Sequence, residues 1–172
     1  SESSDINCTI TGGTFSIGDA DFVREHVAKN ALVAVNADQT ECKVLYNTYF
    51  TYLGSGLKYA GASANSAKIR FGYDFADDFD LEASNWRWNF GINKDSLNTT
   101  TGVNFDANNI TNLVVSGISP LRYTAPIYSQ LVFEAVIDGE TYTVEDTIRG
   151  TYVNYLADAI IANPNENPAV KE

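Results

Sequence analysis

The sequence is poor in the residues that most catalytic sites require. It has one histidine, His26, two cysteines and no methionine. A Ser-His-Asp or Cys-His nucleophile would need that single base beside it, and no Gly-x-Ser-x-Gly motif occurs. No second Cys or His stands near either cysteine at a zinc-ligand spacing. We therefore expect no enzyme, and we expect His26 to be an ordinary surface residue of a helix.

Basic residues are also scarce, with 11 Lys and Arg against 22 Asp and Glu and a formal net charge of -11. Nucleic-acid binding needs clustered Lys and Arg, and here they are scattered singly. An anionic membrane surface would repel the chain for the same reason. No apolar run approaches the roughly 18 residues of a transmembrane helix. We expect no nucleic-acid partner and no membrane insertion.

The start of the chain and its cysteines indicate secretion. The sequence opens at Ser1 without a methionine, as cleavage of a signal peptide would leave it. Cys8 and Cys42 are an even number, and in a secreted chain the pair predicts a disulfide worth on the order of 3–4 kcal/mol. Two buried free thiols, or a bridge between neighbouring subunits, are the alternatives. We expect an extracellular or cell-surface protein.

Aromatic and β-branched residues that repeat with a period of two predict a mostly β chain. Alternating segments occur at residues 5–11, 67–75 and 85–92, and further strands are predicted from an aromatic- and Thr-rich segment at 44–53 and an apolar segment at 110–115. Residues 127–137 and 140–148 flank Asp138-Gly139, a dipeptide typical of the two-residue type I′ turn. That turn sets Ala135 opposite Tyr142, so both strands place their apolar residues on one face. The sequence therefore predicts a hairpin here.

Two short helices are expected among the strands, over about residues 19–31 and 152–161. The second ends before Asn163-Pro164, as a helix should. We predict an antiparallel β-sandwich of the Ig-like or jelly-roll type with one or two short helices. It forms a single domain over residues 1–162, followed by a polar C-terminal tail, residues 163–172, without fixed structure.

An acidic stretch between two predicted strands is the candidate metal site. Calcium takes roughly six to eight oxygen ligands from carboxylates and carbonyls. The carboxylates are those of Asp74, Asp77, Asp78, Asp80 and Glu82. The stretch is no EF-hand, because it lacks the glycine of the sharp turn. A solvated acidic turn is the alternative, and otherwise no cofactor is expected.

Trp86 and Trp88 raise a second binding hypothesis, because exposed flat rings stack on sugars. They share a strand face with Phe90 and Ile92, however, which is typical of a buried face. A core position is therefore the preferred interpretation, and glycan binding would follow if the rings were exposed. Together with the acidic stretch they define the alternative function, a lectin-like, calcium-assisted carbohydrate-binding domain.

The N-terminal segment (residues 5–11) offers a mode of assembly. Its alternation places Ile6, Cys8 and Ile10 on one face, and two glycines follow as a hinge. Such a strand can complete the sheet of a neighbouring copy, whereas pairing within its own sheet is the alternative. The leading expectation is a secreted, non-enzymatic structural or adhesive surface protein. It would be a fibre- or pilus-like subunit that forms a homo-oligomer or polymer through this segment.

Overall fold

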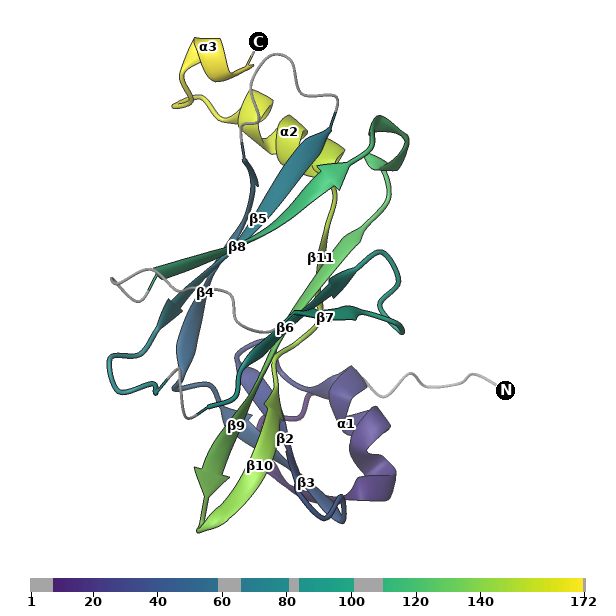
Figure 1. Cartoon of the computed structure of the whole chain (residues 1–172), viewed down its shortest axis with the longest axis vertical. Helices are drawn as coiled ribbons and strands as arrows, with labels where there is room; N and C mark the ends of the chain where they lie inside the picture. The colour runs from purple at the N-terminus through teal and green to yellow at the C-terminus, as the bar shows by residue number, and fades with distance from the viewer. Residues whose placement is uncertain (1–7, 59–65, 81–83, 101–109, 172) are drawn as a thin grey trace. The chain divides into compact units, whose positions relative to one another are not determined.

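The computed structural model describes residues 8–58, 66–80, 84–100 and 110–171 of the 172-residue chain (Figure 1). The described chain is mostly β, with antiparallel sheets and a few short helices, as in a β-sandwich. The expected fold class is confirmed. The chain divides into two compact units, each built from three separate stretches of sequence. Whether residues 1–162 form a single domain stays a prediction.

The first unit comprises Ser1–Thr48, Phe79–Arg87 and Leu131–Thr147. Its strands, in spatial order, are β1 (Gly13–Ser16), β3 (Glu41–Tyr46), β2 (Ala31–Asn36), β10 (Glu140–Glu145) and the second part of β9 (Ile127–Ile137). Every neighbouring pair is antiparallel. A 3-10 turn, η1 (Ile17–Asp19), and helix α1 (Ala20–His26) connect β1 to β2.

Strand β2 is the centre of the first unit, because all six of its residues are buried. Val33 and Val35 join a core cluster with Val23 of α1 and Cys42 of β3. A strand that is buried on both faces shows an unbroken apolar run in place of alternation. The period-two pattern therefore does not mark this strand, and the helix expected to reach Ala31 ends at His26 instead.

The β9–β10 hairpin forms as predicted. Ala135 lies opposite Tyr142, and Phe133 lies opposite Val144. The two turn residues, 138 and 139, have φ angles of 53° and 82°, the positive values of a type I′ turn. The register places the rings of Phe133 and Tyr142 in the core, where both are fully buried.

The second unit comprises Tyr49–Asp78, Trp88–Gln130 and Ile148–Glu172. One sheet has β5 (Ala67–Phe75) between β4 (Phe50–Lys58) and β8 (Ile110–Ile118). The other has the order β7 (Asn98–Thr100), β6 (Arg87–Gly91), the first part of β9, and β11 (Arg149–Thr151). Helix α2 (Val153–Ala162) packs against β4, and η2 (Pro120–Arg122) and α3 (Pro168–Lys171) are shorter.

Buried aromatic rings fill the core of the second unit. Tyr73 of β5 is fully buried and meets the ring of Phe50 edge-on, with centroids 5.5 Å apart. Trp88 of β6 is 4% exposed, and its ring stacks on Phe90 at 4.5 Å. Its indole Nε1 donates a hydrogen bond to Ser129 Oγ of β9 at 2.7 Å. On β5, the burial of Tyr73 shows that the predicted alternation does mark the core face.

Three expected elements differ from the structure. The strand predicted over residues 44–53 is two strands, because β3 ends at Tyr46 and β4 begins at Phe50. Because aromatic residues continue across this break, the sequence pattern does not reveal it. The C-terminal tail contains one helical turn, α3. The described part of the predicted strand over residues 5–11 forms a single parallel bridge, between Ile10 and Val27.

Candidate functional site

The described part of the N-terminal segment is anchored to the first unit through one residue, Ile10. Its side chain is 9% exposed and belongs to the same core cluster as Val23. Its backbone N–H donates to the His26 carbonyl at 2.8 Å, and its carbonyl accepts from the Ala28 N–H at 2.8 Å. Ile6 lies outside the described residues. The described segment thus pairs within its own chain, but across a single bridge.

Thr11 and Gly12 link this bridge to β1, whose first residue is Gly13. Gly13 has φ +119°, a conformation that residues with a side chain rarely adopt. A Cβ on Gly12 would meet no atom within 4 Å, so the space on that side of the chain is open. On that side, a change of direction at Gly12 therefore meets no packed side chain.

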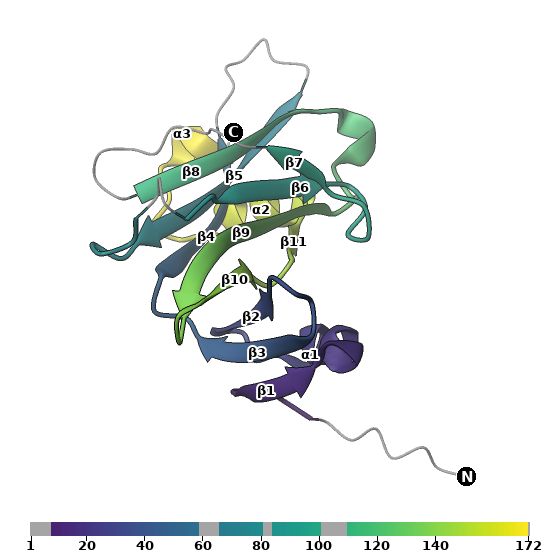
Figure 2. The ribbon, with the colours of Figure 1, turned by 60° about the horizontal axis from the view of Figure 1, so that its bottom comes forward.

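Strand β1 is the edge of the sheet in the first unit (Figure 2). Ile17 N–H donates to the Thr40 carbonyl at 3.1 Å, in register with the β1–β3 ladder. Hydrogen-bonded pairs alternate along an antiparallel ladder, so the backbone groups of Thr14 and the N–H of Ser16 face away from the β3 backbone, whereas the Ser16 carbonyl accepts a weak hydrogen bond from Cys42 Sγ at 3.9 Å. Thr14 and Ser16 are exposed, and β1 carries neither charge nor proline, the usual protections of an edge. Among the described residues, no strand pairs with this side of β1.

The two cysteines do not form the expected disulfide. Both lie among the described residues and both are free, with Cys8 exposed and Cys42 buried. The bridge between Ile10 and Val27 draws the N-terminal segment toward the end of α1, whereas Cys42 lies on β3 between β1 and β2. Burial raises the pKa of the Cys42 thiol. Cys42 is therefore a buried core residue, and Cys8 is the accessible thiol.

The described acidic residues do not gather into a cation site. Asp74 is exposed near the end of β5, and Asp77 and Asp78 are exposed in the turn that follows. Across residues 8–58, 66–80, 84–100 and 110–171, no three Asp, Glu, His or Cys side chains lie together as metal ligands. Asp80 is among these residues, and Glu82 lies outside them. The calcium site stays a prediction.

The two tryptophans do not form an exposed platform. Trp88 is buried in the core of the second unit, so its ring is inaccessible to a sugar. Trp86 precedes β6, lies in the first unit and is half-buried. The stacking surface on which the lectin-like alternative depends is therefore missing at Trp88.

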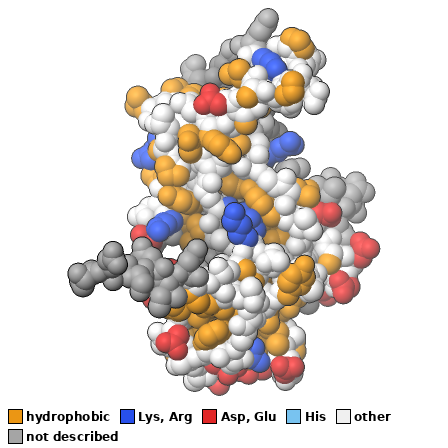
Figure 3. Space-filling view, turned by 180° about the vertical axis from the view of Figure 1, so that it is seen from behind, with side chains coloured by type: hydrophobic (Ala, Val, Ile, Leu, Met, Phe, Trp, Pro, Cys, Tyr) orange, Lys and Arg blue, Asp and Glu red, His pale blue; other side chains and the backbone are white. Residues whose placement is uncertain are grey.

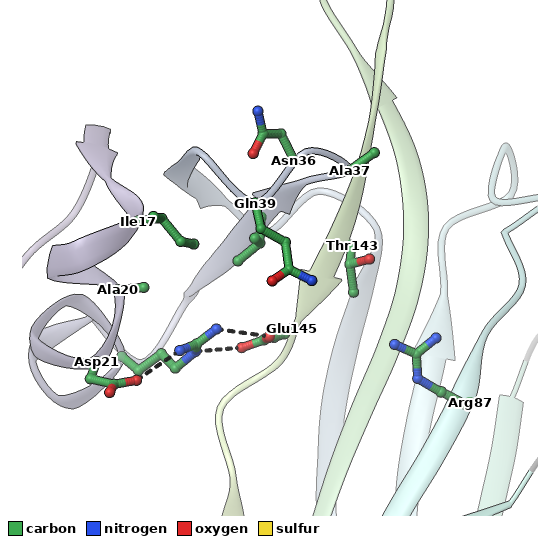
Figure 4. Close-up of a pocket in the computed structure, with 11 residues that line it drawn as sticks. Ile17, Ala20, Asp21, Asn36, Ala37, Gln39, Arg87, Thr143 and Glu145 are labelled. Carbon is green, nitrogen blue, oxygen red and sulfur yellow. Dashed lines mark hydrogen bonds and ion pairs between the residues drawn. The ribbon is translucent and has the colours of Figure 1, made fainter.

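A pocket of about 440 Å³ opens in the first unit (Figure 4), within the range of roughly 300–1,000 Å³ that is usual for small-molecule sites. The guanidinium of Arg24 on α1 lies between two carboxylates. Its Nε is 2.8 Å from Glu145 Oε2, its Nη2 is 3.2 Å from Glu145 Oε1, and its Nη1 is 2.9 Å from Asp21 Oδ1. The hydrogen bond to Glu145 raises the pKa of Arg24. These three charged side chains satisfy one another and join α1 to β10.

Three other lining side chains keep their hydrogen-bonding capacity. Gln39, Arg87 and Thr143 line the pocket, and within the described part of the chain none of their side chains has a hydrogen bond or ion pair. Figure 4 shows them on the side of the pocket away from Asp21. The sequence pattern places Arg87 on the polar face of its strand, but it does not single out any of these residues as a site.

Two observations concern partners. On the face seen in Figure 3, Lys and Arg side chains are scattered singly among acidic and apolar ones. Among the described helices, none has the length and apolar character needed to span a membrane.

Comparison with known proteins adds no candidate: no protein-family model, no curated protein and no solved structure matches this chain. Proposals about function therefore rest on the N-terminal segment, the β1 edge and the pocket.

Proposed function

We propose that the chain is a secreted or cell-surface, non-enzymatic structural or adhesive protein whose copies assemble by exchanging the N-terminal segment. The observation that carries the proposal is that, among the described residues of the segment, Ile10 alone attaches it, two residues before Gly12. In the assembly, the segment leaves its own unit and takes the same place beside Val27 of the next copy. It packs against the same residues in either copy, so the exchange costs little beyond chain entropy.

The geometry of the exchange determines whether the assembly is a closed dimer or a fibre. Reciprocal exchange between two copies closes a dimer, whereas exchange in one direction passes from copy to copy and builds a fibre. The edge of β1 supports the second outcome, because the backbone groups of Thr14 can pair with a strand of a further copy in addition to the exchanged segment. The net charge of -11 keeps free copies apart until exchange joins them.

A reversible lock on the segment tests the proposal. Ile10→Cys and Val27→Cys place two thiols on the two residues of the isolated bridge, within reach of a disulfide. Cys8→Ser in the same chain removes the accessible thiol that would interfere. We expect light scattering to find assemblies of the Cys8→Ser parent, monomers of the oxidised locked variant, and assemblies again after reduction.

A second thiol pair gives the matched control. Val136 and Thr141 are paired, exposed residues of the β9–β10 hairpin, so Val136→Cys with Thr141→Cys forms a disulfide that leaves the segment free. This control should assemble whether oxidised or reduced. Denaturant unfolding curves confirm that each variant is folded. A parent that stays monomeric at every concentration, or a locked variant that assembles as readily as the control, would refute exchange.

A further inference from the structure

We infer that the pocket of the first unit binds a small hydroxylated carboxylic acid, of the hexuronic acid kind, through the guanidinium of Arg87. This ligand site is independent of the proposed assembly. The inference rests on the contrast between the two sides of the pocket. The side formed by α1 and Glu145 has its charges already paired, whereas Gln39, Thr143 and Arg87 present unused donors and acceptors.

The turn between β2 and β3 holds Gln39 in an unfavourable conformation. Its φ is 52°, in a region that favours glycine. Buried Asn36 enforces the turn, because its Oδ1 accepts from Thr40 N at 2.9 Å and from Glu41 N at 3.1 Å, and its Nδ2 donates to Thr40 Oγ1 at 2.8 Å. Such strain persists where the surroundings over-determine it, and it concentrates at binding sites. Here it directs the Gln39 amide toward the pocket (Figure 4).

The charges of the pocket select a monoanion. A carboxylate can accept two parallel hydrogen bonds from one guanidinium, and Arg87 is the lining cation without a carboxylate partner among the described residues. Arg24 is already paired with two carboxylates, those of Asp21 and Glu145. A dianion such as phosphate would therefore lack a second cation, and it would face a chain of net charge -11. One carboxylate is the charge that Arg87 alone can pair.

The uncharged lining groups select the rest of the ligand. The amide of Gln39 can donate and accept, and so can the hydroxyl of Thr143, so both suit hydroxyl groups of a ligand. Ile17, Ala20 and Val35 provide an apolar wall for its carbon skeleton. A sugar acid combines a carboxylate, hydroxyls and an apolar ring face in one small molecule.

Calorimetric titration of the intact chain with sodium glucuronate tests the inference. Glucose lacks the carboxylate, acetate lacks the hydroxyls, and inorganic phosphate tests the charge, so all three serve as comparison probes. Arg87→Gln removes the proposed anchor. Arg122→Gln is the matched control, because Arg122 lies on η2 of the second unit and is exposed. Unfolding curves establish that both variants are folded.

We expect saturable glucuronate binding that weakens about tenfold or more in Arg87→Gln, since a hydrogen bond to a charged group is worth at least one factor of ten. Arg122→Gln should bind like the unmodified chain, and glucose and acetate should bind more weakly. In the unmodified chain, glucuronate should shift the NMR signals of the Gln39 side-chain amide and of the Thr143 backbone amide. Any of three results would overturn the assignment. They are the absence of saturable binding at millimolar glucuronate, phosphate binding as tight as glucuronate binding, and equal affinity of the two variants for glucuronate.

Discussion

Replacing Ser129 by alanine removes the acceptor of a buried indole. Trp88 Nε1 donates to Ser129 Oγ at 2.7 Å, Ser129 is fully buried, and Trp88 is 4% exposed, so water cannot take the place of the hydroxyl. The change deletes one oxygen atom and leaves little cavity. A buried donor without a partner costs about 1–3 kcal/mol, and we expect the free energy of unfolding to fall by about 2 kcal/mol.

A double-mutant cycle separates this hydrogen bond from packing. Trp88→Phe removes the donor, so in that background Ser129→Ala should cost less than about 1 kcal/mol. Urea unfolding is followed by far-UV circular dichroism and by the fluorescence of Trp86, which both backgrounds retain. The reasoning is refuted if Ser129→Ala costs the same in both backgrounds, or less than about 0.5 kcal/mol in the unmodified chain.

Three other features of the described residues can be tested in solution. Gly139→Ala should lower the free energy of unfolding by about 1–2 kcal/mol, because Gly139 has a φ of 82°. Gly18→Ala, at an ordinary φ, should lower it by less. The urea midpoints of the two variants measure this difference. Ellman's reagent should titrate one thiol, Cys8, in the native chain and both thiols after unfolding. The Cys8→Ser variant should have no rapidly reacting thiol. If neither thiol reacted in the native chain, the result would instead indicate the disulfide. The hydrogen bond from Tyr142 to Glu41, with burial second, raises the pKa of Tyr142. The folded state therefore holds this proton more tightly, so stability should be constant below the ordinary tyrosine pKa of about 10 and fall as pH rises above it. Urea unfolding at a series of pH values measures this fall, and Tyr142→Phe should reduce it.

Sequence reasoning succeeds here where a few adjacent residues decide the structure. Asp138-Gly139 sets its own turn, and the turn sets the register of both flanking strands down to the pairing of Ala135 with Tyr142. Helix α2 likewise lies within one residue of its predicted bounds, because an apolar stripe and a following proline mark it locally.

Sequence reasoning fails where the structure depends on contacts between residues that are distant in the chain. β2 is apolar on both faces because α1 and the neighbouring strands cover it, and no local pattern distinguishes such a run from the end of a helix. The placement of Cys8 depends on the bridge of Ile10 to Val27, which the even number of cysteines does not reveal. The pocket brings Gln39, Arg87 and Thr143 together from three separate stretches of the first unit, so no spacing in the sequence could have marked it.

The interleaving of the two units has a consequence for synthesis on the ribosome. The first unit needs the stretch Leu131–Thr147 to complete its sheet, and the second needs Ile148–Glu172, so neither unit can close while only the early part of the chain has emerged. A chain cut anywhere within Trp88–Gln130 would leave both units incomplete and their apolar strands uncovered. Truncated products should therefore be recognised and degraded as unfolded polypeptide, and two halves expressed separately should fold only when they are produced together.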